Sequence, residues 1–151
     1  MRRFIISTLV LIGTLLLAYF MEGGNPLDLI LPSPLIIVVC MPICAVLAVW
    51  GFKDWGRAWK DAFIAGCVDG ATSTAASSAK LWDFYEKACY IAGIVGFILG
   101  LTIIGRNSYQ MADPMTKLGP YFAVDCVTPI IAILFAMVAR ILRARVEKNA
   151  A

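Results

Sequence analysis

Four long apolar stretches occupy most of this chain and constrain its fold more than any other feature. Three contain no charged residue and the last contains only one; they cover approximately residues 4–21, 35–52, 88–105 and 119–139. Each stretch is long enough to cross the ~30 Å hydrocarbon core of a bilayer as an α-helix. Backbone N–H and C=O groups need internal partners in hydrocarbon, so spanning stretches must be helical. The sequence therefore predicts an all-α membrane protein with four transmembrane helices.

The rest of the chain leaves little room for a second domain. The chain is 61% hydrophobic and 15% charged, and its longest polar segment, residues 53–87, is too short to build its own core. We therefore expect one domain, residues 1–151, lying in the bilayer. No small-residue cleavage site precedes Glu22-Gly23-Gly24, so we expect that residues 1–21 are not a cleaved signal peptide and that 4–21 is a span.

The distribution of Lys and Arg predicts the orientation. Basic residues precede the first stretch, follow the fourth and recur through segment 53–87, whereas the other two connections hold only Arg106 and Lys117. The positive-inside rule then places both termini and segment 53–87 in the cytoplasm. The net charge of +3 reflects this orientation, and we expect no nucleic acid as a partner.

Segment 53–87 is predicted to lie along the inner membrane surface. Its first part reads as a short amphipathic helix between spans two and three, in which Arg57 and Asp61 are spaced to pair. Residues 70–78 are small and polar, which predicts a flexible linker. Tryptophan favours the headgroup region of a bilayer. The predicted interfacial anchors are Trp50, Trp55, Trp59 and Trp82.

The third apolar stretch carries a stripe of small residues. Ala92, Gly96 and Gly100 recur every four residues, and Gly93 lies beside them. Such stripes let helices approach each other closely in lipid. The stripe predicts tight packing of this helix against another helix, without identifying the partner.

Asp125 is the only ionisable acid or base inside an apolar stretch, and an intramembrane acid is a candidate functional group. A second interpretation places it at the outer interface, where it caps the helix that follows Pro120 or contacts another subunit. Thr128 follows as a candidate for the same ion path. Pro129 removes a backbone hydrogen bond, which predicts a helix kink or a carbonyl exposed to a cavity.

Residues for catalysis or metal binding are scarce. The chain has no histidine, which excludes Ser-His-Asp and Cys-His sites within it. Cys40 and Cys44 share a helix face, but a metal needs further ligands, so packing is the favoured role of the cysteines. We expect neither an enzyme nor a protein that binds a metal or a cofactor.

Several motifs in the second half occur in a recognisable order. They are Gly93-Ile-Val-Gly96-Phe-Ile-Leu-Gly100-Leu101, Met111-Ala112-Asp113-Pro114, Leu118-Gly119-Pro120 and Ala123-Val124-Asp125-Cys126-Val127-Thr128. This order resembles the last two spans of the MotA/TolQ/ExbB proton-channel family, most closely the MotA-type flagellar stator subunits. The first half is similar too, with Glu22-Gly23-Gly24 and a hairpin of two spans. The resemblance covers roughly two-thirds of the chain.

The chain also departs from the family pattern. Tyr90 stands where MotA proteins have a proline, and Pro129 stands where stator subunits usually have a second threonine. Asp125 replaces a small residue. The large cytoplasmic domain that pushes on the flagellar rotor is reduced to segment 53–87, which argues against an ordinary torque-generating stator.

The resemblance implies an A-type subunit of an ion-driven complex in the bacterial inner membrane. In the family, five A-type subunits form a ring around two single-span B-type subunits, and the B-type subunit carries the membrane Asp. A homo-oligomer, a pentamer, with such a partner is therefore expected here, in contact with membrane lipid. Thr128 and Thr102 can line the ion route, or each can bond its own helix backbone.

Two other functions stay open. The chain can be a non-conducting structural or regulatory scaffold that has kept the stator fold, as Tyr90 and Pro129 suggest. It can also be a small stand-alone transporter, for which Asp125 is the only candidate conducting residue.

Overall fold

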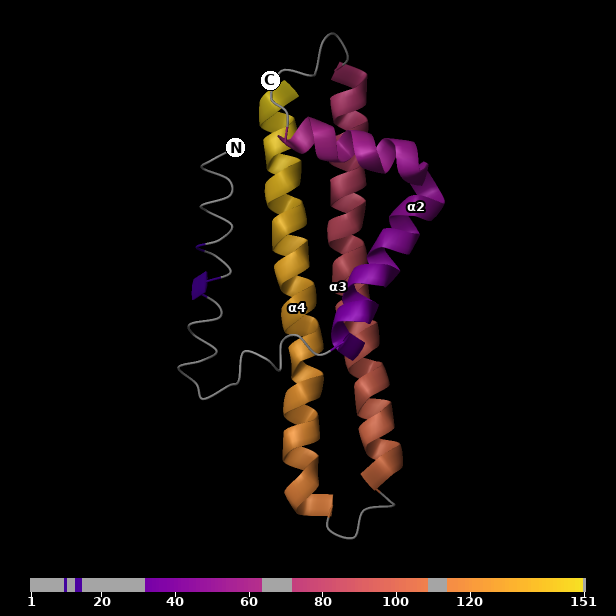
Figure 1. Ribbon diagram of the computed structural model, residues 1–151, viewed down its shortest axis with the longest axis vertical. Helices are drawn as coiled ribbons and strands as arrows, with labels where there is room; N and C mark the ends of the chain where they lie inside the picture. The colour runs from indigo at the N-terminus through magenta and orange to yellow at the C-terminus, as the bar shows by residue number, and fades with distance from the viewer. Residues whose placement is uncertain (1–9, 11–12, 15–31, 64–71, 109–113, 151) are drawn as a thin grey trace.

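The computed structural model describes Val10 and residues 13–14, 32–63, 72–108 and 114–150 of the chain. Its three long helices are α2 (Pro32–Phe63), α3 (Thr72–Ser108) and α4 (Pro114–Ala150). α3 and α4 lie side by side over most of their length, and α2 packs against both (Figure 1).

The prediction of four transmembrane helices is wrong. Within the described residues three helices are long and apolar enough to span a membrane, at Leu35–Phe63, Ala75–Arg106 and Asp125–Asn149. The prediction counted every apolar stretch long enough to cross a bilayer as a span. The described structure supports a spanning helix for three of these four stretches. The predicted first span, 4–21, lies outside the described residues except for Val10, Gly13 and Thr14.

α2 changes direction sharply at Gly51. This residue has φ 78° and ψ 171°, a backbone conformation open essentially only to glycine. The turns before Gly51 run along α3, and the turns after it cross over α3 towards α4 (Figure 1). We call residues 52–63 the arm. It occupies the place of the predicted amphipathic helix.

The arm packs on α3 through an aromatic cluster centred on Trp82. The Trp82 ring is 5.6 Å from the Trp55 ring and 5.1 Å from the Trp59 ring, between centroids. The Trp82 indole N–H also donates to the carbonyl oxygen of Ala58, at 3.4 Å. Trp82 is only 1% exposed, so it is a core residue that joins two helices, which is a different role from the predicted headgroup anchor.

The prediction of a flexible linker at residues 70–78 is wrong from residue 72 onward, because α3 begins at Thr72. Ala75 and Ser78 are buried at 3% and 4% exposure. Small and polar residues have modest helix propensity, but packing overrides so weak a preference. The helix then continues without interruption into the apolar stretch.

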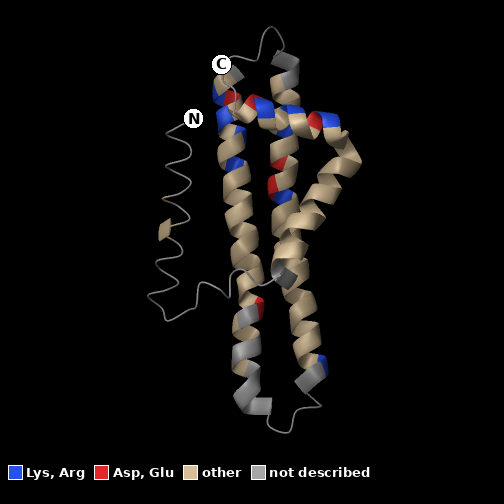
Figure 2. Cartoon of the chain, in the orientation of Figure 1, with Lys and Arg blue, Asp and Glu red and all other residues tan. Residues whose placement is uncertain are grey.

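Most of the charged residues in the described part of α3 and α4 lie towards one end of the pair (Figure 2). α3 has 37 residues and is therefore about 55 Å long, well beyond the ~30 Å of a hydrocarbon core. Lys87 and Arg106 border its uncharged part, which at about 28 Å matches that thickness. α3 therefore continues beyond the apolar layer at the end that carries the arm.

Candidate functional site

The glycines of α3 bring α3 and α4 into close contact. A Cβ atom placed on Gly93 would lie 2.5 Å from the Cβ of Ala132, and one on Gly96 would lie 2.6 Å from Cγ2 of Thr128. Both distances are shorter than real carbon contacts. Ala92 is fully buried. The structure thus brings the predicted stripe against α4, in the close approach that such residues permit.

Asp125 lies directly over Gly100. A Cβ atom on Gly100 would be 1.6 Å from Oδ1 and 2.4 Å from Cγ of Asp125, so the carboxyl fills the space that a side chain at position 100 would need. We call the contact region the seam. It consists of Gly93, Gly96 and Gly100 on α3 and Asp125, Thr128 and Ala132 on α4.

The seam holds Asp125 within the apolar layer. Gly100 is about 20 Å along the helix axis from Lys87 and about 9 Å from Arg106. Asp125 also lies eleven residues after Pro114, the first residue of α4. A helix N-terminus acts on charges within about its first turn, so this position does not favour the capping interpretation.

The electrostatic environment of Asp125 is unfavourable for an ionised carboxylate. The side chain is 7% exposed, and its Oδ2 atom is buried with no hydrogen-bond partner among the described residues. None of the ion pairs in the described part of the chain includes it. A buried charge without a partner costs several kcal/mol, about 2.5–3.5 kcal/mol or more for an acid at mid-membrane.

The two candidate threonines differ. Thr128 is 3% exposed and lies in the seam against Gly96. Thr102 is exposed outside the seam, and its hydroxyl donates to the carbonyl oxygen of Ile98 at 2.8 Å. This is the alternative in which a threonine bonds its own helix. α4 continues as one helix through Pro129, and the kink expected there stays a prediction.

A second polar cluster, which sequence analysis did not identify, joins the arm to the other helices. Ser78 donates a hydrogen bond of 2.6 Å to Oδ2 of Asp61, which is buried at 8% exposure. The side-chain amide of Asn149 donates to the carbonyl oxygen of Asp61, at 3.2 Å. The predicted pairing of Arg57 with Asp61 is wrong, because Arg57 lies 3.7 Å from Asp54 instead.

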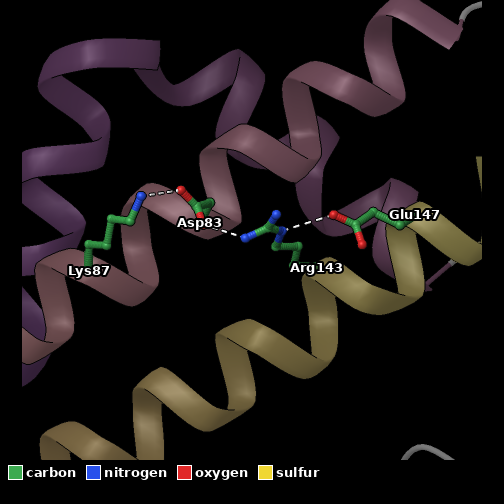
Figure 3. Close-up of polar contacts among 4 residues, drawn as sticks. All are labelled: Asp83, Lys87, Arg143 and Glu147. Atoms are coloured by element: carbon green, nitrogen blue, oxygen red, sulfur yellow. Dashed lines mark hydrogen bonds and ion pairs between the residues drawn. The ribbon is translucent and has the colours of Figure 1, made fainter.

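At the charged end, described side chains of α3 and α4 form a chain of three ion pairs. Lys87 and Arg143 both bind the carboxylate of Asp83, and Arg143 also binds Glu147 (Figure 3). The Lys87–Asp83 and Arg143–Glu147 contacts measure 2.7 and 2.9 Å. These side chains are about one-third exposed or more, so each pair adds little stability, about 0–1 kcal/mol. Only the Arg143–Asp83 pair joins the two helices.

Comparison of this chain with protein-family models, with curated proteins and with solved structures finds no match.

Proposed function

We propose that this chain is an A-type subunit of an ion-driven complex of the MotA/TolQ/ExbB kind, with the α3–α4 pair as a wall of the ion route. The observation that carries the proposal is the seam, where Asp125 and Thr128 are buried within the apolar layer against glycines. Polar side chains at this depth are costly and face a functional site or a partner. The motif order of these two helices supports the same function.

Much of the apolar surface of the helices is not buried within the described part of the chain. Only 17% of the residues in the most apolar part of α2 and 22% of those in α3 are buried. The remaining surface is suited to contact with lipid, and it leaves room for further subunits. Following the resemblance, we propose a ring of five copies around a single-span partner that carries a membrane Asp.

The charged end gives the proposed orientation. Lys and Arg outside the apolar layer favour the cytoplasmic side. The ends of α3 and α4 that carry the arm then face the cytoplasm of a bacterium, and the complex lies in its inner membrane. The described residues at that end form the arm and the ends of α3 and α4, where the family has the large domain that pushes on the flagellar rotor. We therefore propose a driven process other than flagellar rotation.

A non-conducting scaffold is the second candidate, and one observation favours it. The Thr102 hydroxyl bonds its own helix and lies outside the seam, so the second threonine expected on the ion route is not among the described seam residues. A scaffold predicts a ring of copies that transports no ions.

The test is purification of the tagged chain from its native membrane in mild detergent, followed by native mass measurement and identification of bound proteins. The proposal expects about five copies with fewer copies of a single-span protein bearing a membrane Asp. The complex in liposomes should carry ions, and an Asp→Asn change in the partner should stop the flux. A ring without that partner and without ion flux would refute the proposal and support the non-conducting scaffold.

A further inference from the structure

The resemblance does not account for Asp125. The family has a small residue at this place, and the ion-carrying Asp belongs to the partner subunit. Here the chain holds a carboxyl of its own over Gly100, with Oδ2 buried and without a hydrogen-bond partner among the described residues. If ionised, this group would place an unpaired negative charge inside the apolar layer.

The described surroundings offer neither a counter-charge nor a cage of metal ligands. The charged side chain nearest along α3 is Arg106, which is exposed and about 9 Å further along the axis. The other titratable groups described on the neighbouring helix segments are the thiols of Cys126 on α4 and Cys40 on α2. Among the described residues no three His, Cys, Asp or Glu side chains gather to hold a metal.

The side-chain oxygen atoms at the described seam are also few for a bare cation. Besides the Asp125 carboxyl, the Thr128 hydroxyl one turn away is the only side-chain oxygen among the seam residues. Cations held by oxygen take about six ligands or more. A proton needs only one oxygen atom, and it removes the charge.

We propose that Asp125 is a proton-binding site within this chain, and that its carboxyl is protonated and neutral in the closed seam. A proton from the aqueous phase forms an O–H bond on the carboxylate, whose charge goes from −1 to 0. Proton binding by Asp125 does not depend on the proposed function. Only the route that the proton takes after it leaves Asp125 rests on that function. Gly100 leaves the space for the carboxyl, and the apolar layer excludes water from it.

A hydrophobic carbodiimide tests this directly on the unmodified chain. Dicyclohexylcarbodiimide reacts with protonated carboxyls in membranes: the acid oxygen adds to the central carbon, the proton moves to a nitrogen, and the adduct rearranges to a stable N-acylurea. We expect labelling of the Asp125 peptide in native vesicles, measured by mass spectrometry. Labelling should fall roughly tenfold per pH unit once the carboxyl ionises. A water-soluble carbodiimide should label the half-exposed Glu147 instead.

Two variants of the site and two control variants distinguish a proton site from a merely reactive patch. Asp125→Asn keeps the shape and must abolish the adduct on this peptide. Gly100→Ala pushes the carboxyl out of its space and should reduce the labelling at least tenfold, whereas Gly105→Ala should leave it unchanged, since a Cβ there meets no described atom within 4 Å. Arg106→Gln should also leave the labelling of Asp125 unchanged, because Arg106 forms no ion pair with the Asp125 carboxyl.

The outcomes distinguish this inference from the proposed function. No adduct on Asp125 at any pH, in folded wild-type protein, overturns the proton site whether or not a single-span partner is found. Protection of Asp125 by Na⁺ at constant pH overturns it in favour of a sodium site. A pH-dependent adduct in a ring without partner and flux supports the proton site and refutes the ion-driven complex.

Discussion

Gly93 and Gly100 lie two turns apart on one face of α3 but meet different kinds of atom. A Cβ on Gly93 would collide with the Cβ of Ala132, which cannot move without its helix. A Cβ on Gly100 would collide with the end of the Asp125 side chain, which can rotate. The same substitution therefore has a different consequence at each position: separation of helices at Gly93 and displacement of a carboxyl at Gly100.

We predict that Gly93→Ala lowers the free energy of unfolding by about 1–3 kcal/mol, because overpacking forces α3 away from α4. Gly105→Ala is the matched control and should be neutral or slightly stabilising, since alanine has the higher helix propensity. Circular dichroism during titration of mixed micelles with a denaturing detergent measures both.

Removal of the opposing methyl group provides the decisive control. Ala132→Gly in the Gly93→Ala background should restore much of the lost stability, because the two Cβ atoms no longer meet. Equal stability of Gly93→Ala and wild type would show that the seam is looser than the structure indicates.

Among the helices, α2 depends most on a single backbone conformation. Gly51 directs the arm across α3, and any other residue at φ 78° is strained by about 1–3 kcal/mol. We predict that Gly51→Ala loosens the arm and shifts tryptophan fluorescence to longer wavelength, because Trp55 and Trp59 leave the Trp82 cluster. Gly56→Ala, which lies within the arm and meets no described atom, should keep the native spectrum.

The hydrogen bond between Ser78 and Asp61 holds the other end of the arm. Ser78→Ala leaves the buried Asp61 carboxyl without this donor, which should cost about 1–3 kcal/mol of unfolding free energy. Ser77→Ala, one residue away and exposed, is the control and should cost less than about 0.5 kcal/mol. In the double variant Asp61→Ala with Ser78→Ala, the loss of unfolding free energy should be much smaller than the sum of the losses in the two single variants. A loss equal to that sum would mean that the two side chains do not interact.

The contrast between the seam and the arm shows what sequence alone can reach. Gly93, Gly96, Gly100 and Asp125 stood out because their chemistry is unusual inside an apolar helix, whatever packs beside them. The arm was only partly predictable. The early start of α3 and the partner of Asp61 depend on contacts between residues 17 or more positions apart, for which local composition carries no signal.

On the scale of the whole molecule, charge and length together determine how the chain sits in a membrane. The apolar part of α3 matches a bilayer, and the charged extension carries the arm, the aromatic cluster and the ion pairs on one side. Within the seam, Gly100 and the Asp125 carboxyl over it lie nearer the opposite side, since Gly100 is about 9 Å from Arg106 along the axis. A proton on Asp125 would thus have a shorter path to that side.

This arrangement predicts opposite accessibility for the two ends of the α3–α4 pair. In a variant with all five cysteines replaced by alanine, Arg106→Cys should react with a membrane-impermeant maleimide from outside intact spheroplasts. Lys148→Cys, exposed at the charged end, should react only in inverted vesicles, because positive residues favour the cytoplasm. Detergent-solubilised samples of both variants show that each thiol is reactive. The reverse pattern would place the arm and the ion pairs outside the cell. The opening of any proton route nearest Asp125 would then face the cytoplasm.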